Sequence, residues 1–521
     1  MLAFSGLMKA GWLSLFLICS LFLETQGQSR ITSDLRFNTP KENLGVGVNS
    51  DYTETKPVIS SDGKTLYYCR QNHPENIRGK QDEQDIYYSR LEDGQWTSSQ
   101  NIGWPLNDQH PNGISSVSPD GNSLLLINEY INGGYVKPGV SIAHKNKKGW
   151  TYPQKLEIEN FYNFSPYVDY FMSSNGKVLF LSVQRREGLG DQDLYVSLMK
   201  NKNWTEPVNL GQTINTGGAD FAPFLAADGK TLYFASEGHP GYGGSDIFYS
   251  KRLDETWGNW STPINLGPAV NTHTWDAYYS ISAKGDYAYF VSKNEKNSSK
   301  DIYRIQLPEE VRPDPVVLVK GKVLNANTNE PLFASVHFNS KKALSEHGIA
   351  RSNPQNGSYK IVLPKGDSYQ YLAKIDGYLS LAKYIDLTEA NRYGEVEENL
   401  YLVPLEKGQK IPLSNIFFVR TKDELLQKSY SELDRLVNIL KEYSTLEIEL
   451  GGHTDNHGQS TLNFDLSLRR VATVKQYLIN QGIASSRLHT KGYGDTQPIA
   501  SNDRELNRRL NRRVEFTILS L

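Results

Sequence analysis

The sequence contains very little cysteine. Only two cysteines occur in 521 residues, Cys19 and Cys69. Because Cys19 falls in a stretch that reads as a secretory signal, Cys69 alone is expected in the processed chain. A disulfide needs two cysteines, so no intramolecular bridge is predicted and ordinary burial must hold the fold. The chain is long enough to do this across several domains.

Net charge and long apolar runs are also scarce. Fifty-six basic residues face 58 acidic ones, which leaves a formal charge of −2 and argues against a nucleic-acid binder. Beyond residue 27, no segment approaches the roughly 20 apolar residues that a membrane helix needs. We therefore predict no membrane-spanning segment in the mature chain.

Familiar catalytic motifs are missing as well. The sequence has no Gly-x-Ser-x-Gly elbow and no His-Glu-x-x-His pair, the signatures of common hydrolases and zinc peptidases. We predict no catalytic residue, no metal site and no cofactor, and hence a protein that is not an enzyme.

Residues 1–27 have the pattern of a signal peptide. Lys9 gives a positive start, residues 12–23 are almost purely apolar, and small residues at Thr25 and Gly27 suit cleavage before Gln28. Cys19 leaves a lipoprotein open as an alternative, although the bulky Ile18 stands where a lipid-attachment site favours a small residue. Export to the periplasm is the predicted fate.

A turn followed by an apolar run recurs five times in the first three hundred residues. The turn glycines are 53 to 58 residues apart: Gly63, Gly121, Gly176, Gly229 and Gly285. Four of the five turns read Asp-Gly or Asn-Gly, which is typical of a β-hairpin.

Each repeat continues in the same order. A second β segment follows the hairpin run at residues 85–89, 140–143, 193–197, 246–250 and 301–303. Most units then carry a tryptophan and a pair of asparagines six residues apart. These are Trp96, Trp150, Trp204 and Trp260, and the pairs Asn101/Asn107, Asn209/Asn215 and Asn265/Asn271. Four strands in about fifty residues are typical of a β-propeller blade.

The ends of the repeat region suggest ring closure. The fifth unit stops at Leu307 without its last element, whereas Asn43 and Asn49 supply that element before the first hairpin. An N-terminal strand that completes the final blade would remove exposed sheet edges. We predict an all-β propeller over 31–307 with five blades, or six if 31–56 contain a degenerate unit. The repeats resemble the WD-like propellers of Tol-type periplasmic proteins.

A linker and a small β domain follow. Residues 308–315 are rich in proline and acid, as in a linker. Short β segments at close spacing over 316–405 predict a β-sandwich. Gly357-Ser358-Tyr359 with Leu363-Pro364, and Gly377-Tyr378 further on, resemble the carboxypeptidase regulatory-like domain, which is not itself catalytic.

The last hundred residues change to alternating β and α signals. Strands are predicted at 416–419, 446–450, 488–491 and 514–519. Ser429 and Glu432 have capping-box spacing before an apolar helix face. A second helix is expected at 462–481, and its buried side is predicted to carry Phe464, Leu468, Val471, Val474 and Leu478. A short helix is expected near 503–510. This order predicts an α+β domain over 411–521 in a multidomain chain.

Two opposite charges in this domain suit a zwitterionic ligand. Asp455 ends Gly-His-Thr-Asp after a strand, and Arg470 follows on the second helix. Asn463 and Arg470 are seven residues apart, about 10 Å along one helix face. Since helical side chains lean towards the N-terminus, Arg470 should reach towards Asp455. Such a pair can hold an ammonium and, bidentately, a carboxylate. A plain Asp–Arg salt bridge that only orients the loop is the alternative.

The motifs around this pair resemble the OmpA-like C-terminal domain. They are Gly452–Asp455, Asn463, 466–470, Gly492–Gly494 and 511–515. The resemblance implies peptidoglycan binding through diaminopimelate. Asp455 would bind its ammonium and Arg470 its carboxylate, with Asn463, Arg512 and the backbone of Thr454 in support. Val471 departs from the usual Ala after the arginine.

Together these features predict a Gram-negative cell-envelope protein in the periplasm, associated with the outer membrane. Peptidoglycan and, through the propeller, envelope proteins are the expected partners. The trio of domains resembles envelope proteins of secretion machineries, notably the type IX system, where such a chain would tether an outer-membrane complex to the wall. The alternative function is a propeller-based enzyme that processes glycans or peptides and carries a cell-wall anchor.

Overall fold

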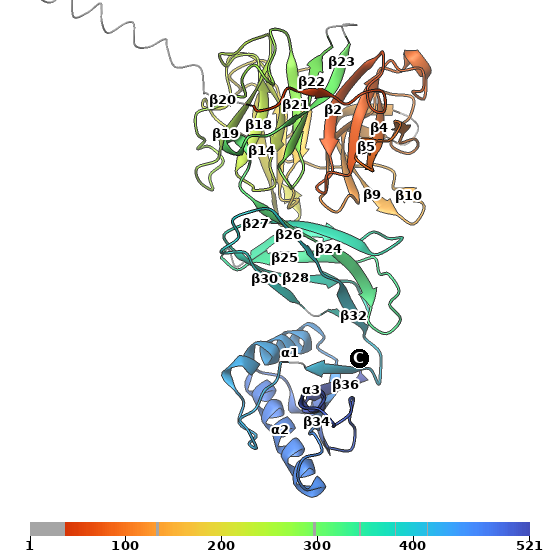
Figure 1. The fold of residues 1–521 in the computed structure, drawn as a ribbon, viewed down its shortest axis with the longest axis vertical. Coiled ribbons are helices and arrows are strands. Elements are labelled where there is room, and N and C mark those ends of the chain that lie inside the picture. The colour runs from red at the N-terminus through yellow and green to blue at the C-terminus, as the bar shows by residue number, and fades with distance from the viewer. Residues whose placement is uncertain (1–36, 132–134, 295–298, 343–344, 381, 414) are drawn as a thin grey trace, which may run out of the picture. The chain divides into compact units, whose positions relative to one another are not determined.

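The computed structural model of this protein describes residues 37–131, 135–294, 299–342, 345–380, 382–413 and 415–521. The predicted signal peptide over 1–27, with Cys19, lies outside these residues. The chain divides into two compact units. The first comprises residues up to 322 with 331–372 and 382–399, and the second comprises 323–330, 373–381 and 400–521. Figure 1 gives the order of their elements along the chain.

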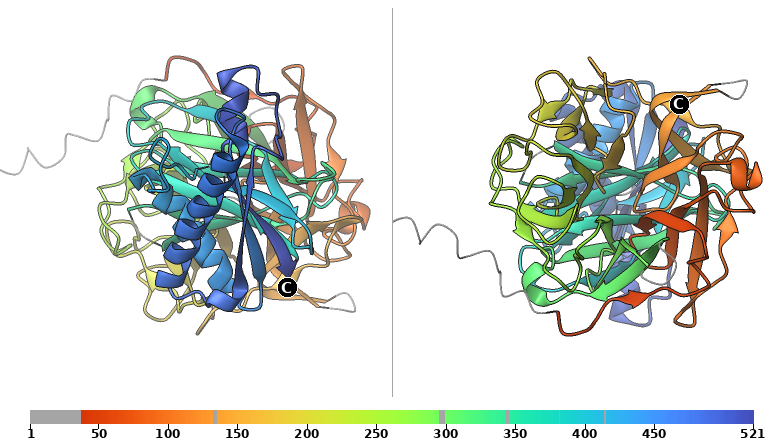
Figure 2. Two further views of the ribbon diagram at one scale, coloured as in Figure 1. Left: turned by 90° about the horizontal axis from the view of Figure 1, so that it is seen from below. Right: turned by 90° about the horizontal axis from the view of Figure 1, so that it is seen from above.

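Five small antiparallel sheets, each open at both edges, occupy the described part of residues 37–307. Their strand orders are β2-β3-β4-β5 with β6 on β4; β7-β8-β9-β10 with β11 on β9; β12-β13-β14-β15 with β16 on β14; β17-β18-β19-β20; and β21-β22-β23-β1. The sheets are arranged around a common centre (Figure 2, right).

The strands of these sheets are β1 (Glu42–Asn43), β2 (Thr53–Ile59), β3 (Thr65–Gln71), β4 (Asp85–Glu92), β5 (Gln95–Trp96), β6 (Gln100–Asn101), β7 (Gly113–Val117), β8 (Ser123–Ile131), β9 (Tyr135–Asn146), β10 (Gly149–Trp150), β11 (Gln154–Lys155), β12 (Asp169–Met172), β13 (Val178–Val183), β14 (Asp193–Lys200), β15 (Asn203–Trp204), β16 (Val208–Asn209), β17 (Asp220–Leu225), β18 (Thr231–Ser236), β19 (Asp246–Lys251), β20 (Ile264–Asn265), β21 (Asp276–Ile281), β22 (Tyr287–Lys293) and β23 (Lys300–Gln306). The predicted hairpin runs and second strands all fall in these elements.

The first strands of the sheets contact one another in a closed cycle. β2 contacts β7, β7 contacts β12, β12 contacts β17, β17 contacts β21, and β21 returns to β2. β1 pairs with β23, with Asn43 opposite Tyr303, so the predicted pairing of the N-terminal segment with the last hairpin is confirmed. The five turn glycines all have φ of 69–70°, a left-handed conformation that glycine adopts without strain. We refer to these five sheets as the ring.

The paired asparagines of the repeats are joined by hydrogen bonds. Asn107 donates through Nδ2 to Oδ1 of Asn101 at 2.7 Å, and the Gly103 N–H donates to the same oxygen at 2.9 Å. Asn107 also pairs with both backbone groups of Ile86. The same side-chain bond recurs in Asn43/Asn49, Asn209/Asn215 and Asn265/Asn271. The asparagines therefore satisfy buried backbone groups in four of the five sheets.

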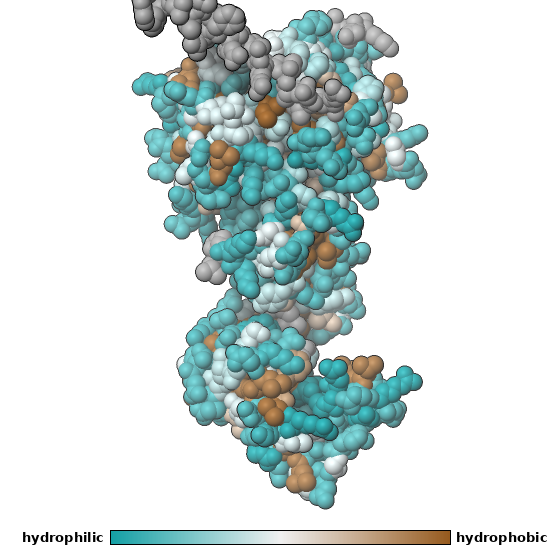
Figure 3. Space-filling view, turned by 60° about the vertical axis from the view of Figure 1, so that its left-hand side comes forward, coloured by the Kyte–Doolittle hydropathy of each residue, from teal (hydrophilic) through white to brown (hydrophobic). Residues whose placement is uncertain are grey.

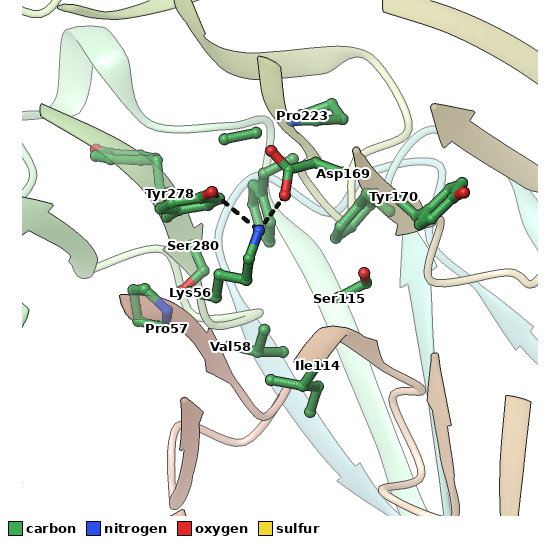
Figure 4. Close-up of a pocket in the computed structure, with 14 residues that line it drawn as sticks. Lys56, Pro57, Val58, Ile114, Ser115, Asp169, Tyr170, Pro223, Tyr278 and Ser280 are labelled. Atoms are coloured by element: carbon green, nitrogen blue, oxygen red, sulfur yellow. Dashed lines mark hydrogen bonds and ion pairs between the residues drawn. The ribbon is translucent and has the colours of Figure 1, made fainter. Parts of the chain in front are cut away.

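A buried ion pair occupies the centre of the ring. Nζ of Lys56 contacts Asp169 and donates to the Tyr278 hydroxyl at 2.9 Å (Figure 4). Burial alone would lower the pKa of the Lys56 ammonium, but Asp169 and Tyr278 outweigh it, and the pKa is raised. Lys56 has φ of +53° and Tyr278 φ of +58°. We refer to these three residues as the central triad.

Four of the five hairpin turns contact the next part of the first unit. Lys360 pairs with Asp62. The Arg351 N–H donates to Oδ2 of Asp120 at 2.7 Å, and the Arg351 carbonyl accepts from Nδ2 of Asn122 at 2.9 Å. Further contacts of this kind join Lys177 to Glu346 and the Asp314 N–H to Asp228. The repeated acidic turns thus bind residues 314–360, which gives them a structural role. Residues 308–315, predicted to be a linker, include a short 3-10 turn (Glu309–Val311) with Val311 buried.

Residues 316–405 contribute two further sheets, with strand orders β27-β24-β32-β29 (β31 on β24) and β26-β25-β28-β30. Their strands are β24 (Val316–Asn325), β25 (Ser335–Ser340), β26 (Ser345–Arg351), β27 (Ser358–Pro364), β28 (Ser368–Lys374), β29 (Tyr378–Ser380), β30 (Lys383–Asp386), β31 (Gly394–Glu397) and β32 (Leu400–Pro404). The short strands expected here are present, and the sequence pattern did not indicate β26, β29, β30 or β31.

The C-terminal domain in the second unit is an α/β structure. Its sheet has the order β33-β36-β34-β35, antiparallel except between β34 and β35. The elements are β33 (Lys410–Leu413), α1 (Tyr430–Glu442), β34 (Glu447–His453), α2 (Ser460–Asn480), β35 (Leu488–Gly494), α3 (Glu505–Asn511) and β36 (Val514–Ser520). The predicted alternation of strands and helices is confirmed, and the apolar face of α1 is buried as expected.

Three predictions for this domain were wrong. Residues 416–419 are not a strand; β33 takes that place, and 417–426 form a loop closed by a bridge between Phe418 and Leu425. Ser429 does not cap α1, because its hydroxyl bonds to both backbone groups of Phe417. Phe464 and Leu468 are 47% and 38% exposed. In the N-terminal half of α2, Asn463 and Ser467 are buried instead. They lie against the backbone of Gly452, Gly492 and Gly494.

The face shown in Figure 3 is largely hydrophilic, and its apolar side chains form small separate groups. Single exposed apolar residues are normal on proteins. Among the described residues, no helix combines the length and the apolar character that crossing a membrane requires.

The central triad generates a stability prediction. Lys56→Met would leave the Asp169 carboxylate buried without its cation, which should destabilise the ring by about 3–5 kcal/mol. Lys56→Met/Asp169→Leu should recover much of this loss. All eight tryptophans precede residue 276, so tryptophan fluorescence during urea unfolding reports on this part of the chain. Lys64→Met, at an exposed lysine, is the matched control; equal unfolding midpoints for the two lysine variants would contradict the prediction.

Candidate functional site

The candidate residues come from three segments around the end of β34. Thr454 and Asp455 follow that strand, Asn463 and Arg470 lie on α2, and Arg512 follows α3. The helix approaches the sheet closely where the strands carry glycine. A Cβ on Gly452 would lie 2.4 Å from the Ser467 carbonyl oxygen, and one on Gly492 would lie 2.8 Å from Ser467 Oγ. This contact, which a larger residue would block, brings the helix face to the Asp455 loop.

Asp455 is held from several sides. Oδ2 pairs with Nη1 of Arg512 at 2.5 Å, and Oδ1 accepts the His457 N–H at 3.0 Å. Nδ2 of Asn463 donates to the Asp455 carbonyl at 3.3 Å. The carboxylate is therefore fixed before any ligand arrives. Each carboxylate oxygen has more than one lone pair, so both can still accept from a ligand.

Arg470 lies beside the same loop but is bound differently. Its Nε donates to the Lys422 carbonyl at 3.0 Å, and its guanidinium stacks 4.9 Å from the centre of the Phe418 ring. Burial lowers the pKa of Arg470, and the charges of Asp423, Arg512 and Asp455 also act on it. Within the part of the chain that the structure describes, Arg470 and Asp455 form no direct ion pair. The Arg470 charge is thus left for an anionic group.

The alternative prediction was a plain salt bridge between Asp455 and Arg470, but the arginine that pairs with Asp455 is Arg512. It bridges Asp455 and Glu505, with Nη2 at 2.6 Å from Glu505 Oε1. The contact with Glu505, followed by that with Asp455, raises the pKa of Arg512. The salt bridge that orients the loop therefore exists, but it joins Asp455 to Arg512.

Thr454 takes part mainly through the backbone. Its N–H donates to the Gly494 carbonyl at 2.8 Å, so a backbone contact with a ligand would fall to its carbonyl group. Its Oγ1 is buried and has no hydrogen-bond partner among the described residues.

A second group of ionisable side chains, His453, Arg513 and Glu515, lies next to the Asp455 loop in the chain fold. His453 is buried and stacks on Tyr493 with 4.9 Å between ring centres. Its Nε2 is 3.2 Å from Glu515 Oε1, although not in regular hydrogen-bond geometry. Nε of Arg513 donates to Glu515 Oε2 at 2.9 Å. Burial raises the pKa of Glu515, but His453 and Arg513 outweigh it and hold the pKa at about 2.

Sequence interpretation missed four residues near the site: Phe418, Lys422, Asp423 and Glu505. The first three lie in the 417–426 loop, and of these only Phe418 falls in the strand predicted at 416–419. The apolar run at 416–419 hid the loop, whereas Thr421, with φ of +60°, forms the turn. Glu505 stands seven residues before Arg512 and could have been found as its partner across the short helix.

Asp455 and Arg470 offer one carboxylate and one guanidinium that form no direct ion pair within the described residues, although their charges act on each other. No group of three His, Cys, Asp or Glu residues among those described is placed to hold a metal ion. The side chains of Asp455 and Arg470 can recognise a ligand through hydrogen bonds and charge.

Residues 417–512 match the family model described as the OmpA family. Outer membrane porin F of Pseudomonas fluorescens is 38% identical over 97 residues, 19% of this chain and 30% of that protein. Probable lipoprotein YiaD of Escherichia coli K12 is 36% identical over 141 residues, 26% of this chain and 64% of that protein. Peptidoglycan-binding protein ArfA of Mycobacterium bovis is 36% identical over 94 residues, 18% of this chain and 29% of that protein.

The similarity thus concerns one domain. The chain spans less than a third of porin F and of ArfA. The C-terminal domain is OmpA-like, and the described residues that precede it are mostly β-strand.

The pKa of Glu515 generates a prediction on acid stability. The folded value of about 2 lies below the ordinary 4.5. Ionised Glu515 therefore stabilises the folded domain fully above pH 4.5. This stabilisation is lost as pH falls from about 4.5 towards 2. Glu515→Gln should lower the unfolding temperature of this domain at neutral pH and flatten its decline below pH 4.5.

The α-helices of the described residues all lie in this domain, so their circular-dichroism signal is the measurement. Glu442→Gln, at an exposed glutamate, is the control. An unchanged acid decline in Glu515→Gln would show that this carboxylate carries no linked stability.

Proposed function

We propose that this chain is a non-enzymatic cell-envelope protein whose C-terminal domain anchors it to peptidoglycan through diaminopimelate. The observation that carries the proposal is the Asp455–Arg470 arrangement in an OmpA-like domain. The relative named as a peptidoglycan-binding protein shares this domain at 36% identity. The side-chain end of diaminopimelate presents one ammonium and one carboxylate.

Each charge of that ligand has a matching group. The carboxylate would accept from Arg470, whose Nε and ring contacts leave the Nη atoms for a ligand. The ammonium would donate to Asp455, which Arg512 and the His457 N–H hold in position. Asn463 supports the loop from α2, and Thr454 would add its carbonyl. Charge-assisted hydrogen bonds of this kind are shorter and stronger than neutral ones.

The rest of the chain would act on the periplasmic side of the envelope, in association with the outer membrane. We assign residues 31–307 to a five-bladed β-propeller, because the first strands of the ring contact in a closed cycle and its last sheet is completed by β1. Residues 316–405 would be a carboxypeptidase regulatory-like β-sandwich that the acidic turns of the propeller bind. Tethering of an outer-membrane complex, such as a type IX secretion machinery, to the wall is the role that this combination of domains supports.

Co-sedimentation with purified peptidoglycan tests the anchor. Asp455→Asn and Arg470→Met each remove one charge-assisted contact, so each should weaken binding about tenfold or more. Arg469→Met removes the neighbouring exposed arginine and should sediment like the parent chain. Circular dichroism of each variant verifies that the domain is folded. Undiminished sedimentation of folded Asp455→Asn and Arg470→Met would refute the anchor mechanism.

A further inference from the structure

The ring has two ends, and only one of them is used by contacts within the first unit. The turn ends carry Gly63 and its four counterparts, and the acidic side chains there bind residues 314–360. The opposite ends of the same strands surround a cavity of about 840 Å³, to which all five sheets contribute. We refer to this cavity as the mouth. It lies at the starts of β2, β7, β17 and β21, away from the turns.

The central triad forms the floor of the mouth. Lys56, Asp169 and Tyr278 line the mouth and also the smaller pocket drawn in Figure 4. Because Lys56 and Asp169 neutralise each other, the floor offers no net charge. The charges that a ligand would meet are therefore on the walls.

One wall presents a cation on an aromatic surface. Nζ of Lys300 lies 3.4 Å from the centre of the Trp275 ring, which in turn stacks on Phe221. Burial lowers the pKa of Lys300. Among the described residues, Lys300 forms no ion pair. A carboxylate from outside the chain could therefore approach this ammonium without displacing a partner.

Three further carboxylates line the mouth, those of Glu83, Asp191 and Glu237. Asp191 and Glu237 act on each other electrostatically and form the acidic part of the wall. Burial, followed by the negative charge of Asp191, raises the pKa of Glu237. Neither carboxylate forms an ion pair within the part of the chain that the structure describes. A cation would relieve the repulsion between them.

Both carboxylates are attached to a rigid rim. The Glu237 N–H donates to the Ala219 carbonyl at 2.9 Å, and the Asp220 N–H donates to the Gln192 carbonyl at 2.7 Å. The two acidic residues thus flank the single segment 219–220. A Cβ on Gly190 would lie 2.3 Å from the Gly218 carbonyl oxygen, so these loops pack backbone to backbone. Such a rim loses little freedom when a ligand binds.

Between the charges, the mouth carries side-chain amides. Gln71, Gln84, Asn128, Gln184 and Gln192 all line it. An amide side chain both donates and accepts hydrogen bonds, as a peptide group does. The cavity therefore combines a cationic wall, an acidic wall and groups that match a polypeptide backbone.

We propose that the mouth binds an extended polypeptide segment of a partner protein that carries one acidic and one basic side chain. Lys300 takes the acidic side chain, and Asp191 with Glu237 takes the basic one. The amides bind the backbone, and Trp275 packs against the apolar part of the segment. This proposal rests on the propeller assignment above, but its site is separate from the peptidoglycan anchor.

The test uses the full chain and fluorescent decapeptides in a Gly/Ser/Ala background. Four sets carry one Lys and one Glu at varied separations, Lys alone, Glu alone, or neither. Fluorescence anisotropy is measured at low salt, because salt screens exposed charges. Peptides with both charges, at the separation that fits, should bind about tenfold more tightly than peptides with one. An N-acetylglucosamine oligomer added as competitor should not displace them.

Variants of the wall residues test which wall recognises each charge of the peptide. Lys300→Met should abolish the preference for Glu, and Asp191→Asn/Glu237→Gln should abolish the preference for Lys. Lys300→Glu should reverse the first preference, so that peptides with two Lys bind best, which a purely structural role would not produce. Lys293→Met and Glu159→Gln, at exposed positions outside the mouth, are the controls.

Two results would overturn the proposal: equal or absent binding of all four peptide sets, or binding of the oligosaccharide instead of the peptides. All mouth variants should retain peptidoglycan co-sedimentation. Failure of the mouth proposal and failure of the anchor are therefore distinguishable in the same preparations.

Discussion

The candidate site depends on the close approach of α2 to the ends of β34 and β35. Gly452, Gly492 and Gly494 leave room for the helix backbone near Ser467 and Phe464. Ser467 uses this proximity, since its Oγ accepts the Gly494 N–H at 3.0 Å and donates to the Phe464 carbonyl. With the helix fixed there, Asn463 reaches the Asp455 carbonyl and Arg470 reaches the 417–426 loop. A side chain at any of these glycines would move the helix and separate the two charges.

The ring is built from one repeated unit. The first strands of the repeats contact one another in a closed cycle, and four of the five turns contact residues 314–360. Asparagine pairs satisfy backbone groups in four of the five sheets, and left-handed glycines allow the hairpin turns. The acidic residues of those turns bind residues 314–360. The repeat therefore explains why the turn ends are occupied by contacts within the first unit.

Sequence patterns predicted the parts of this protein that depend on local chemistry. The hairpin strands, the pairing of the N-terminal segment with β23, the buried face of α1 and the extent of α2 all follow from periodicity and turn residues. Phe464 and Leu468 were assigned to the core because they are apolar at helical spacing. The glycine backbones opposite them accept only the small Ser467 and the polar Asn463, which periodicity cannot reveal.

Contacts between residues far apart in the chain could not be predicted either, because periodicity and turn residues report only on local structure. The hydroxyl of Ser429 bonds to Phe417, twelve residues away, instead of to its own helix. The pairing of Asp455 with Arg512 across 57 residues could not be distinguished from a pairing with Arg470. The opposite charges on the walls of the mouth belong to different sheets and meet only when the ring closes.

The central claim is that one acid and one base recognise the two charges at the end of a stem-peptide side chain. Calorimetric titration of the full chain with a stem tripeptide that contains diaminopimelate, and with its lysine counterpart, tests this directly. Lysine keeps the ammonium but lacks the carboxylate that Arg470 would bind. We expect the diaminopimelate peptide to bind about tenfold or more tightly than the lysine peptide. Equal affinity for the two peptides would contradict the account.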